Sequence, residues 1–300
     1  MSAARPFAIV VNYNGGAVTR ACVESLRAQA GTGLEIVIAD NASSPQERAG
    51  LAADWDEAAD VEVLELAENG HFAGGVNAGA LRALERGATH LLVLNNDTVI
   101  EEGCVAALVA EADRDPAYGL VGPLLLDLGD RHPLSLGENY AAWSLAVPRS
   151  LLKVREPAPQ AWDVGGIMGS ALLIRADCFL RVGPYREDLL VYYEEVDWCL
   201  RARAAGYQPR ITPDAVVLHD GMRGFAAGLQ PYAARLKTRN QMRLALDHGG
   251  ALSFAVFLPI FLLLVVASSV IYGLRFDFPT VRALWRGVRE GCAWIVRGHP

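Results

Sequence analysis

Residues 89–98 read THLLVLNNDT, an apolar run that stops at two asparagines and an aspartate. Three earlier segments have the same form: residues 7–12, 34–39 and 61–66 are short and apolar or alternating, and each runs into Asn, Asp or Glu. The stretches between them carry apolar residues at helical spacing, and one of these stretches stops at Gly87. Buried strands that alternate with helices predict an α/β fold in which helices flank a mostly parallel sheet.

The polar residues at the four strand ends predict a ligand site. Open α/β sheets bind their ligands at the carboxyl ends of the strands, which meet along one edge. One polar strand end means little, but four ends rich in Asn and Asp indicate a shared site. The residues expected along this edge are Asn12, Asp40, Asn69, Asn95, Asn96 and Asp97.

Asp97 stands just past a buried strand, where its carboxylate can hold a hard divalent cation. Mg²⁺ or Mn²⁺ prefers oxygen ligands and can share them with a diphosphate, so such an ion stabilises a departing nucleoside diphosphate. The competing interpretation makes Asp97 the N-cap of a following helix, a common position for aspartate. His219 ends another short apolar run, residues 215–218, and is a candidate ligand for metal or phosphate.

Two adjacent glutamates, Glu194 and Glu195, begin a predicted helix that extends to Ala205. The helix dipole favours carboxylates at this end, and Asp197 can pair with Arg201 one turn on, so a purely structural interpretation exists. The functional interpretation makes one glutamate a general base that takes a proton from an acceptor hydroxyl. Like charges side by side would raise the pKa of one of them into a useful range.

The glycine-rich residues 70–79, GHFAGGVNAG, lead into a predicted helix. They match neither the G-x-G-x-x-G fingerprint nor a P-loop, which argues against a dinucleotide oxidoreductase and a P-loop kinase. Their glycines still let the backbone approach a ligand closely.

The middle of the chain is less regular. Residues 118–159 are rich in Pro and Gly, which predicts a loop or lid over the sheet edge. Regular patterns return with a predicted strand at residues 171–175, a helix at 195–205 and a strand at 215–218.

The C-terminal region differs from the rest in charge and hydropathy. The net charge of -7 divides into about -13 before residue 235 and +6 from there on. Residues 249–274 carry no charge, and at about 1.5 Å per residue they could cross a hydrocarbon core of about 30 Å. Arg282, Arg286 and Arg289 then recur at helical spacing, as in a basic amphipathic helix on an anionic surface.

These features predict an α/β domain at residues 1–245 and a membrane-associated segment at 246–300, made of a hydrophobic helix and a basic amphipathic helix. We expect a re-entrant or in-plane arrangement with its bend at Pro259; a single span and a buried core hairpin are the alternatives. The five cysteines form no C-x-x-C pair, which fits buried thiols in a reducing compartment. The apolar run at residues 7–11 is too short for a signal peptide, so we expect the body in the cytoplasm.

Taken in order, seven segments resemble the inverting glycosyltransferases of family 2, which have the GT-A fold, and among them the rhamnosyltransferase-like enzymes of bacterial cell-wall and O-antigen assembly. The matching segments are VVNYNG at 10–15, IADNAS at 38–43, NGHFAGGVNAG at 69–79, LNNDT at 94–98, GSALLIR at 169–175, YEEVDWCLR at 193–201 and RN at 239–240.

The resemblance implies a role for each matching residue. Asp97 would be the retained carboxylate of the D-x-D metal motif, and His219 would complete the metal or diphosphate site. Glu195 aligns with the general base, with Glu194 as a possible substitute. The residues implied to bind the nucleotide-sugar donor are Asn12, Asp40 (on the base or ribose), Asn69, Gly74, Gly75, Asn77, Asn95 and Asn96.

Two residues depart from the family pattern. Asn95 replaces the first aspartate of D-x-D, which leaves one protein carboxylate for the metal in this motif. Glu195 stands where aspartate is more usual, so its carboxylate reaches farther.

The resemblance implies an inverting, Mg²⁺- or Mn²⁺-dependent hexosyltransferase at the cytoplasmic face of the bacterial cell membrane. The expected donor is dTDP-rhamnose, with UDP-sugars such as UDP-galactofuranose or a UDP-hexosamine as rivals. The expected acceptor is a polyprenyl-linked glycan or polysaccharide. Membrane lipid is an expected partner, whereas the acidic body argues against nucleic acid.

Two other classes of function compete with this reading. A sugar nucleotidyltransferase would need a basic, glycine-rich loop after the first strand, but residues 12–16 are followed by no Lys or Arg until Arg20. A non-catalytic, glycan-binding membrane protein could lack Asp97 or both glutamates, and all three are present.

Overall fold

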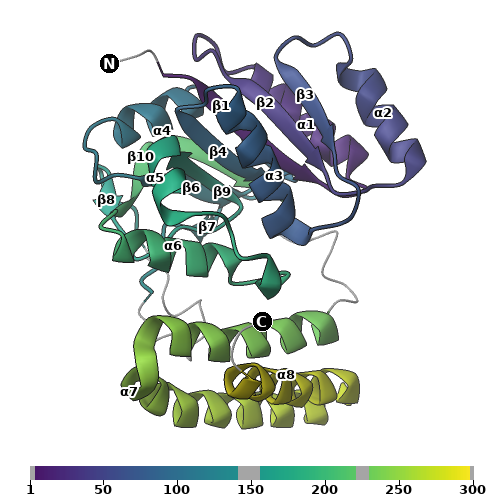
Figure 1. Cartoon of the computed structure of the whole chain (residues 1–300), viewed down its shortest axis with the longest axis vertical. Coiled ribbons are helices and arrows are strands. Elements are labelled where there is room, and N and C mark those ends of the chain that lie inside the picture. The colour runs from purple at the N-terminus through teal and green to yellow at the C-terminus, as the bar shows by residue number, and fades with distance from the viewer. Residues whose placement is uncertain (1–3, 141–155, 221–229, 298–300) are drawn as a thin grey trace.

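The computed structural model describes residues 4–140, 156–220 and 230–297. A sheet with helices on both faces forms the α/β domain, and the C-terminal helices form a further layer beneath it (Figure 1). The described strands are β1 (Pro6–Asn12), β2 (Glu35–Asp40), β3 (Val61–Glu65), β4 (His90–Asn95), β5 (Thr98–Ile100), β6 (Leu120–Asp127), β7 (Pro133–Ser135), β8 (Trp162–Asp163), β9 (Ala171–Arg175) and β10 (Pro209–His219). The described helices are α1 (Gly16–Arg27), α2 (Pro45–Trp55), α3 (His71–Glu85), α4 (Cys104–Ala112), α5 (Ala176–Val182), the 3-10 helix η3 (Glu187–Leu189), α6 (Glu194–Ala204), α7 (Gln230–Leu274) and α8 (Phe278–Arg297).

The first four strands of the α/β pattern are confirmed. They lie in the order β3-β2-β1-β4, and each neighbouring pair is parallel. The register sets Asn12 beside Asp40 and Val11 beside Asn95. The carboxyl ends of these strands therefore meet at one edge, as the sequence predicted.

The second half of the sheet is mixed. β9 is antiparallel to both β4 and β6, whereas β10 is parallel to β6 and antiparallel to β5. The predicted helix-flanked α/β sheet is confirmed, but among the described strands parallel pairing is confined to β3-β2-β1-β4 and to the pair β6–β10.

β6 occupies part of the segment predicted to be a loop or lid. It lies between β9 and β10, so for residues 120–127 that prediction is wrong. The misleading residue is Pro123, which has no N–H to donate to a strand ladder. The β6–β10 register shifts at this point, because Gly122 pairs with Ile211 while Leu124 pairs with Val216. Residues 141–155 of the same prediction lie outside the described residues.

Side chains that alternate along the strands fill a core on each face of the sheet. Phe7 and Ile9 of β1 face the core lined by α3, α5 and α6, and Ala8 and Val10 face the core lined by α1 and α4. Helix α3 packs closely on β1, since a Cβ on Gly79 would lie 2.5 Å from Ile9 Cγ2.

Helix α7 changes direction at Gly250, whose φ of 65° and ψ of -176° are not helical. Glycine adopts a positive φ without a Cβ clash, so it suits such a bend. We predicted the bend at Pro259 and this is wrong, because Pro259 lies inside the helical second half (residues 251–274). The two halves of α7 run side by side below α6 (Figure 1).

The C-terminal helices share a third core with the α/β domain. Phe257 and Phe261, from the second half of α7, join Val196 of α6 in this core. Helix α8 crosses the first half of α7, where a Cβ on Gly291 would lie 2.8 Å from Met242 Sδ. In the described ranges, α7 is the one helix long and apolar enough to cross a membrane, and only 17% of its most apolar window is buried.

Candidate active site

Asn12 joins the loops at the N-terminal half of the sheet edge. Its Nδ2 donates to Asp40 Oδ1 at 2.8 Å and to Ser43 Oγ at 3.2 Å, and its Oδ1 accepts from Thr19 Oγ1 at 2.7 Å. Asn96 joins the same set through a 2.9 Å bond from its Nδ2 to Thr19 Oγ1. We call these five residues the donor-side network.

Asp40 and Asn12 have no exposed surface. Ser43 donates to both carboxylate oxygens of Asp40, from Oγ at 2.5 Å and from its backbone N–H at 3.1 Å. The network therefore fixes the loops after β1 and β2. A direct contact between Asp40 and a base or ribose stays a prediction.

Asp97 and His219 face each other farther along the edge. The β10–β5 pairing sets His219 beside Thr98, and His219 Nε2 lies 3.1 Å from Asp97 Oδ1. This contact lacks the geometry of a hydrogen bond, and among the described residues Asp97 Oδ1 is buried without a hydrogen-bond partner. Two ligand atoms bound to Mg²⁺ at about 2.1 Å and at a right angle lie about 3 Å apart. The pair therefore fits a divalent cation.

Asp97 is not the N-cap of a helix, so that competing interpretation is wrong. It lies in the turn between β4 and β5, and α4 begins only at Cys104, with Gly103 at its N-cap. The position leaves the carboxylate at the sheet edge, available to a ligand.

Asn95 connects this pair to β9. Its Nδ2 lies 3.4 Å from His219 Nε2 and 3.4 Å from Ser170 Oγ. Its backbone N–H donates to the Ser170 carbonyl at 3.1 Å. The amide of Asn95 thus lies beside the two proposed metal ligands, where the family's first D-x-D carboxylate would stand.

Glu194 and Glu195 are the first residues of α6, and their exposed fractions are only 6% and 7%. Glu195 packs against Gly169, where a Cβ would lie 3.1 Å from Glu195 Cβ. Gly169 directly precedes Ser170, the partner of Asn95. The structure thus connects the predicted base to the predicted metal ligands through two residues whose roles the sequence did not reveal.

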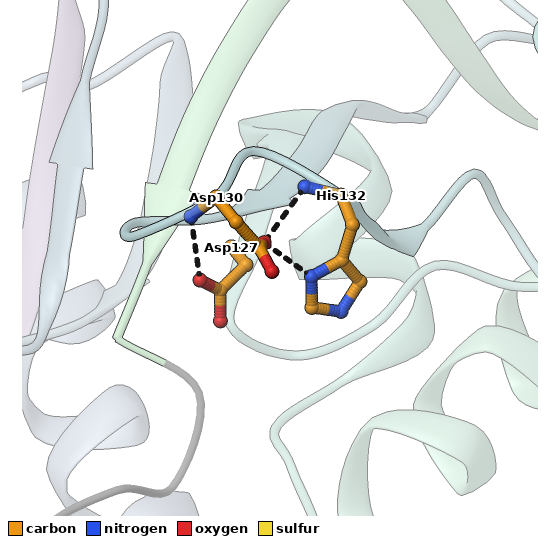
Figure 2. Close-up of side chains that lie close together, drawn as sticks. All are labelled: Asp127, Asp130 and His132. Atoms are coloured by element: carbon orange, nitrogen blue, oxygen red, sulfur yellow. Dashed lines mark hydrogen bonds and ion pairs between the residues drawn. The ribbon is translucent and has the colours of Figure 1, made fainter.

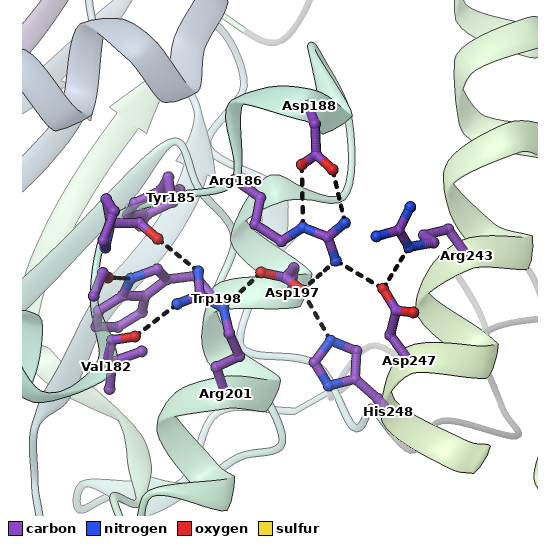
Figure 3. A network of polar contacts seen from close by, with 12 residues as sticks. Val182, Tyr185, Arg186, Asp188, Asp197, Trp198, Arg201, Arg243, Asp247 and His248 are labelled. Carbon is purple, nitrogen blue, oxygen red and sulfur yellow. Dashed lines mark hydrogen bonds and ion pairs between the residues drawn. The ribbon is translucent and has the colours of Figure 1, made fainter. Parts of the chain in front are cut away.

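Asp197, farther along the same helix, is held by three cationic or basic side chains (Figure 3). The predicted pair with Arg201 is confirmed at 2.7 Å, and His248 Nε2 and Arg186 Nη1 lie 2.9 and 3.6 Å from Oδ1. Burial acts to raise the pKa of Asp197, but the hydrogen bonds and charges of these neighbours outweigh it and hold the pKa below its usual range.

The glycine-rich segment serves packing as part of α3 itself. Gly75 is buried against Val11, whose Cγ1 would lie 2.6 Å from an added Cβ. Asn77 Nδ2 donates to the Tyr185 carbonyl at 2.9 Å and to Glu187 Oε1 at 2.8 Å. These contacts hold Gly75 and Asn77 in the fold, and their place in the donor pocket stays a prediction.

The donor-binding role of Asn69 and Gly74 stays a prediction. Asn69 Oδ1 accepts from the backbone N–H of His71 at 2.8 Å, which fixes the start of α3. A Cβ on Gly74 would meet only the Glu187 carboxyl group, at 3.9 Å, so the backbone here is open to a close approach.

A second group of possible ligands lies in the β6–β7 turn (Figure 2). The ligand atoms of Asp127, Asp130 and His132 lie within 4.8 Å of one another. However, Asp127 Oδ1 accepts from the Asp130 N–H at 3.2 Å, and Asp130 Oδ1 accepts from the His132 N–H at 3.1 Å. Such bonds are typical of aspartates that shape a turn. We assign this group to the turn.

The fold is the GT-A fold of nucleotide-sugar glycosyltransferases. The solved mannosyltransferase PcManGT from Pyrobaculum calidifontis, in complex with GDP-Man and Mn2+, has a TM-score of 0.59. The likeness covers 96% of this chain and 87% of that chain at 15% identity, which shows the fold alone. The model of glycosyl transferase family 2 matches residues 7–181. The match includes more than half of the chain, and the chain belongs to this family.

Two curated relatives have names that specify a sugar. An N-acetylglucosaminyl-diphospho-decaprenol L-rhamnosyltransferase of Mycobacterium tuberculosis is 32% identical over 141 residues, 43% of this chain and 46% of that protein. The dTDP-rhamnosyl transferase RfbF of Shigella flexneri is 24% identical over 217 residues, 71% of this chain and 68% of that protein. The chain spans about half the length of the curated relatives it matches at 32% and 33% identity, with 46% and 55% covered.

Proposed function

We propose that this chain is an inverting, metal-dependent glycosyltransferase that moves rhamnose from dTDP-rhamnose to a polyprenyl-linked glycan. The observation that carries the proposal is the contact of Asp97 with His219 at the sheet edge, beside Asn95, which bonds to Ser170. Glu195 packs against Gly169, the residue before Ser170. Membership of glycosyl transferase family 2 supports sugar transfer as the reaction at this site.

The reaction that we propose is a direct displacement at the anomeric carbon. The Glu195 carboxylate takes the proton of the acceptor hydroxyl. At the same time the hydroxyl oxygen attacks the anomeric carbon and forms the new glycosidic bond. The bond to the nucleoside diphosphate breaks on the opposite side, and its electron pair leaves with the diphosphate, which inverts the anomeric centre. Asp97 and His219 would hold Mg²⁺ or Mn²⁺, which supplies charge stabilisation for the leaving diphosphate.

The relatives and one solved neighbour support the choice of substrates and metal. Both named relatives are rhamnosyltransferases, and the Mycobacterium tuberculosis protein has a decaprenol-linked sugar in its name. PcManGT was solved with a nucleotide-sugar and Mn2+. We therefore propose dTDP-rhamnose ahead of a UDP-sugar.

We also propose that residues 246–300 lie in the plane of the cytoplasmic membrane surface and that residues 1–245 form the catalytic domain. The second half of α7 runs beside the first, and its outward side chains are apolar, with Leu252 83%, Leu263 68% and Leu274 77% exposed. Arg282 and Arg286 of α8 could meet anionic lipid headgroups. Because the second half of α7 packs beside the first half, it can contact the membrane surface without crossing the bilayer.

A donor panel with and without metal tests the reaction. The full chain in detergent micelles, given a polyprenyl-diphosphate sugar, should transfer from dTDP-rhamnose with Mn²⁺ and lose this activity in EDTA. Transfer from UDP-galactofuranose or a UDP-hexosamine alone would change the donor assignment. Synthesis of a nucleotide-sugar from a nucleoside triphosphate would replace the proposed class with a nucleotidyltransferase.

Cysteine labelling tests the membrane arrangement. Cys292 is exposed, whereas the other four cysteines are buried, so an impermeant thiol reagent should report on α8 alone. In intact spheroplasts the in-plane arrangement leaves Cys292 unlabelled, and permeabilised cells restore the labelling. Labelling from outside in intact spheroplasts would show that α7 crosses the membrane.

A further inference from the structure

The loop before α6 has an unusual backbone. Leu190, Tyr192 and Tyr193 all have positive φ, at 66°, 72° and 74°. Bulky residues avoid this region because their Cβ atoms crowd the backbone, so the conformation persists only where neighbours impose it. Residues of this kind cluster at functional sites.

Asn240 of α7 holds this loop. Its side chain has no exposed surface, and its Nδ2 points at three carbonyl oxygens, those of Leu189 at 3.0 Å, Val191 at 3.2 Å and Tyr192 at 2.8 Å. Its Oδ1 accepts from Nε of Arg239 at 2.9 Å. The whole amide group is thus engaged with the loop and with its own neighbour.

Two neighbours of Asn240 on α7 contact the same loop. Arg239 Nη2 donates to the Leu189 carbonyl at 2.8 Å, and Lys237 Nζ lies 4.6 Å from the centre of the Tyr192 ring. Apolar packing in the third core already docks α7 on α6. The polar contacts therefore do something that packing does not, which is to fix individual carbonyl groups.

The loop fixes the start of α6 and with it the two glutamates. Tyr193 is the N-cap of this helix, and its carbonyl accepts from the Asp197 N–H at 2.9 Å. Glu195 follows two residues later, with Gly169 against its other side. A change in the backbone of Tyr193 would therefore turn Glu195 relative to Gly169 and the sheet edge.

A second clamp from α7 acts on α6 itself. His248 Nε2 contacts Asp197 at 2.9 Å, and Asp247 Oδ2 lies 2.8 Å from Arg186 Nη1, which also faces Asp197 (Figure 3). The segment that carries the glutamates is thus held by α7 both before and after them.

We propose that Asn240 is a positioning residue for the general base: by holding the loop 190–193, in which three residues have positive φ, it sets the carboxylate of Glu195 against the acceptor hydroxyl. The proposal rests on the proposed function, since it needs Glu195 to act on an acceptor. It gives the RN pair at 239–240 a physical role, because Arg239 orients the amide that Asn240 presents.

The test compares Asn240→Ala with Thr238→Val in the full chain with Mn²⁺. Thr238 is a matched control, because it lies on the same helix, is 3% exposed and donates only to its own helix, at the Ala234 carbonyl, 2.7 Å away. Asn240→Ala should lower kcat by about 10²-fold, the effect of a misplaced catalytic group, while KM and Kd for the donor stay near wild type. Thr238→Val should keep the wild-type kcat. Asn240→Asp, which keeps the shape but lacks N–H donors, should behave like the alanine variant.

Two further measurements separate positioning from misfolding. Calorimetric titration with donor should give a stoichiometry near one for each variant, which excludes an unfolded fraction as the cause of a low kcat. Amide hydrogen exchange should accelerate at residues 190–197 in Asn240→Ala and remain wild type in the strands. A wild-type kcat in Asn240→Ala, or unchanged exchange in this segment, would overturn the positioning role alone. A wild-type chain that transfers no sugar from any donor would overturn the proposed function, and the positioning role with it.

Discussion

The polar side chains at the two halves of the sheet edge differ in how they are hydrogen-bonded. In the donor-side network, Asn12 and Asp40 are fully buried and bonded to each other. At the proposed metal site, Asp97 Oδ1 lies 3.1 Å from His219 and, among the described residues, has no hydrogen-bond partner. A buried polar group without a partner costs free energy unless a ligand satisfies it. The difference distinguishes residues that are bonded within the fold from residues that we propose to bind a metal ion.

The largest expected effect comes from Asp97→Ala. It should lower kcat by about 10³-fold, in the range for the loss of one electrostatic stabiliser, and abolish the response to Mn²⁺. The free energy of unfolding should not fall, because among the described residues Asp97 Oδ1 accepts no hydrogen bond that the change would remove. Initial rates across a Mn²⁺ series and urea unfolding measure the two quantities. Full wild-type activity in excess EDTA would contradict the metal site.

The next largest effect is expected from Glu195→Gln. This change removes the base and keeps its shape, so kcat should fall by about 10²-fold. Donor Kd, measured by calorimetry, should stay the same. Glu194→Gln is the matched control and should remain active. If Glu194→Gln were the inactive variant, the base would be one residue earlier.

Asn12→Ala tests the other side of the comparison. Thr19 and Asp40 would lose a buried hydrogen-bond partner, so the free energy of unfolding should fall by about 1–3 kcal/mol. Urea unfolding gives this value. Asn69→Ala is the control, because Asn69 is exposed and bonds only within its own turn. An equal loss of unfolding free energy in both variants would show that the buried Asn12 contributes no more to stability than the exposed Asn69.

The smallest effect concerns pH. The pKa of Asp197 is lower in the folded chain than its ordinary value of 3.8, because His248, Arg201 and Arg186 stabilise the carboxylate against burial. Below that ordinary value the unfolded chain takes up the proton first, so this contribution to stability is complete at neutral pH and is lost as the pH falls through the folded pKa. Urea unfolding between about pH 2 and 7 covers the range in which aspartates titrate and should show the loss, and Asp197→Asn should lack it.

The sequence predicted the N-terminal half of the fold well because each element there has a local signature. Buried runs such as residues 89–94 end in polar side chains, and parallel pairing brings those ends together. β6 lacked such a signature, since Pro123 is tolerated only because the ladder to β10 shifts beside it. That shift depends on a strand almost ninety residues later in the chain, which a local pattern does not show.

The candidate site was predicted by residue type but not by role. Asp97 and His219 lie together as expected, although they are far apart in sequence. For Gly75 and Asn77 the structure adds packing contacts that the motif does not show, with Val11 and with Tyr185. Asn240 belongs to the matching RN pair, but the sequence indicated no role for it, because its contacts are with the backbone of a loop about fifty residues earlier.

The glycines of α8 bear on how this protein can be made soluble for biophysical work. Gly287 and Gly291 pack α8 closely on the first half of α7. Phe257 and Phe261 of the second half belong to the third core, which also contains Val196 of α6. Deletion of the residues after Gly250 would remove part of this core and expose apolar side chains of the truncated protein to water, which favours aggregation. A soluble variant should therefore keep both halves of α7 and helix α8, and replace apolar residues on their outward face with polar ones. The leading positions are Leu252, Leu263 and Leu274.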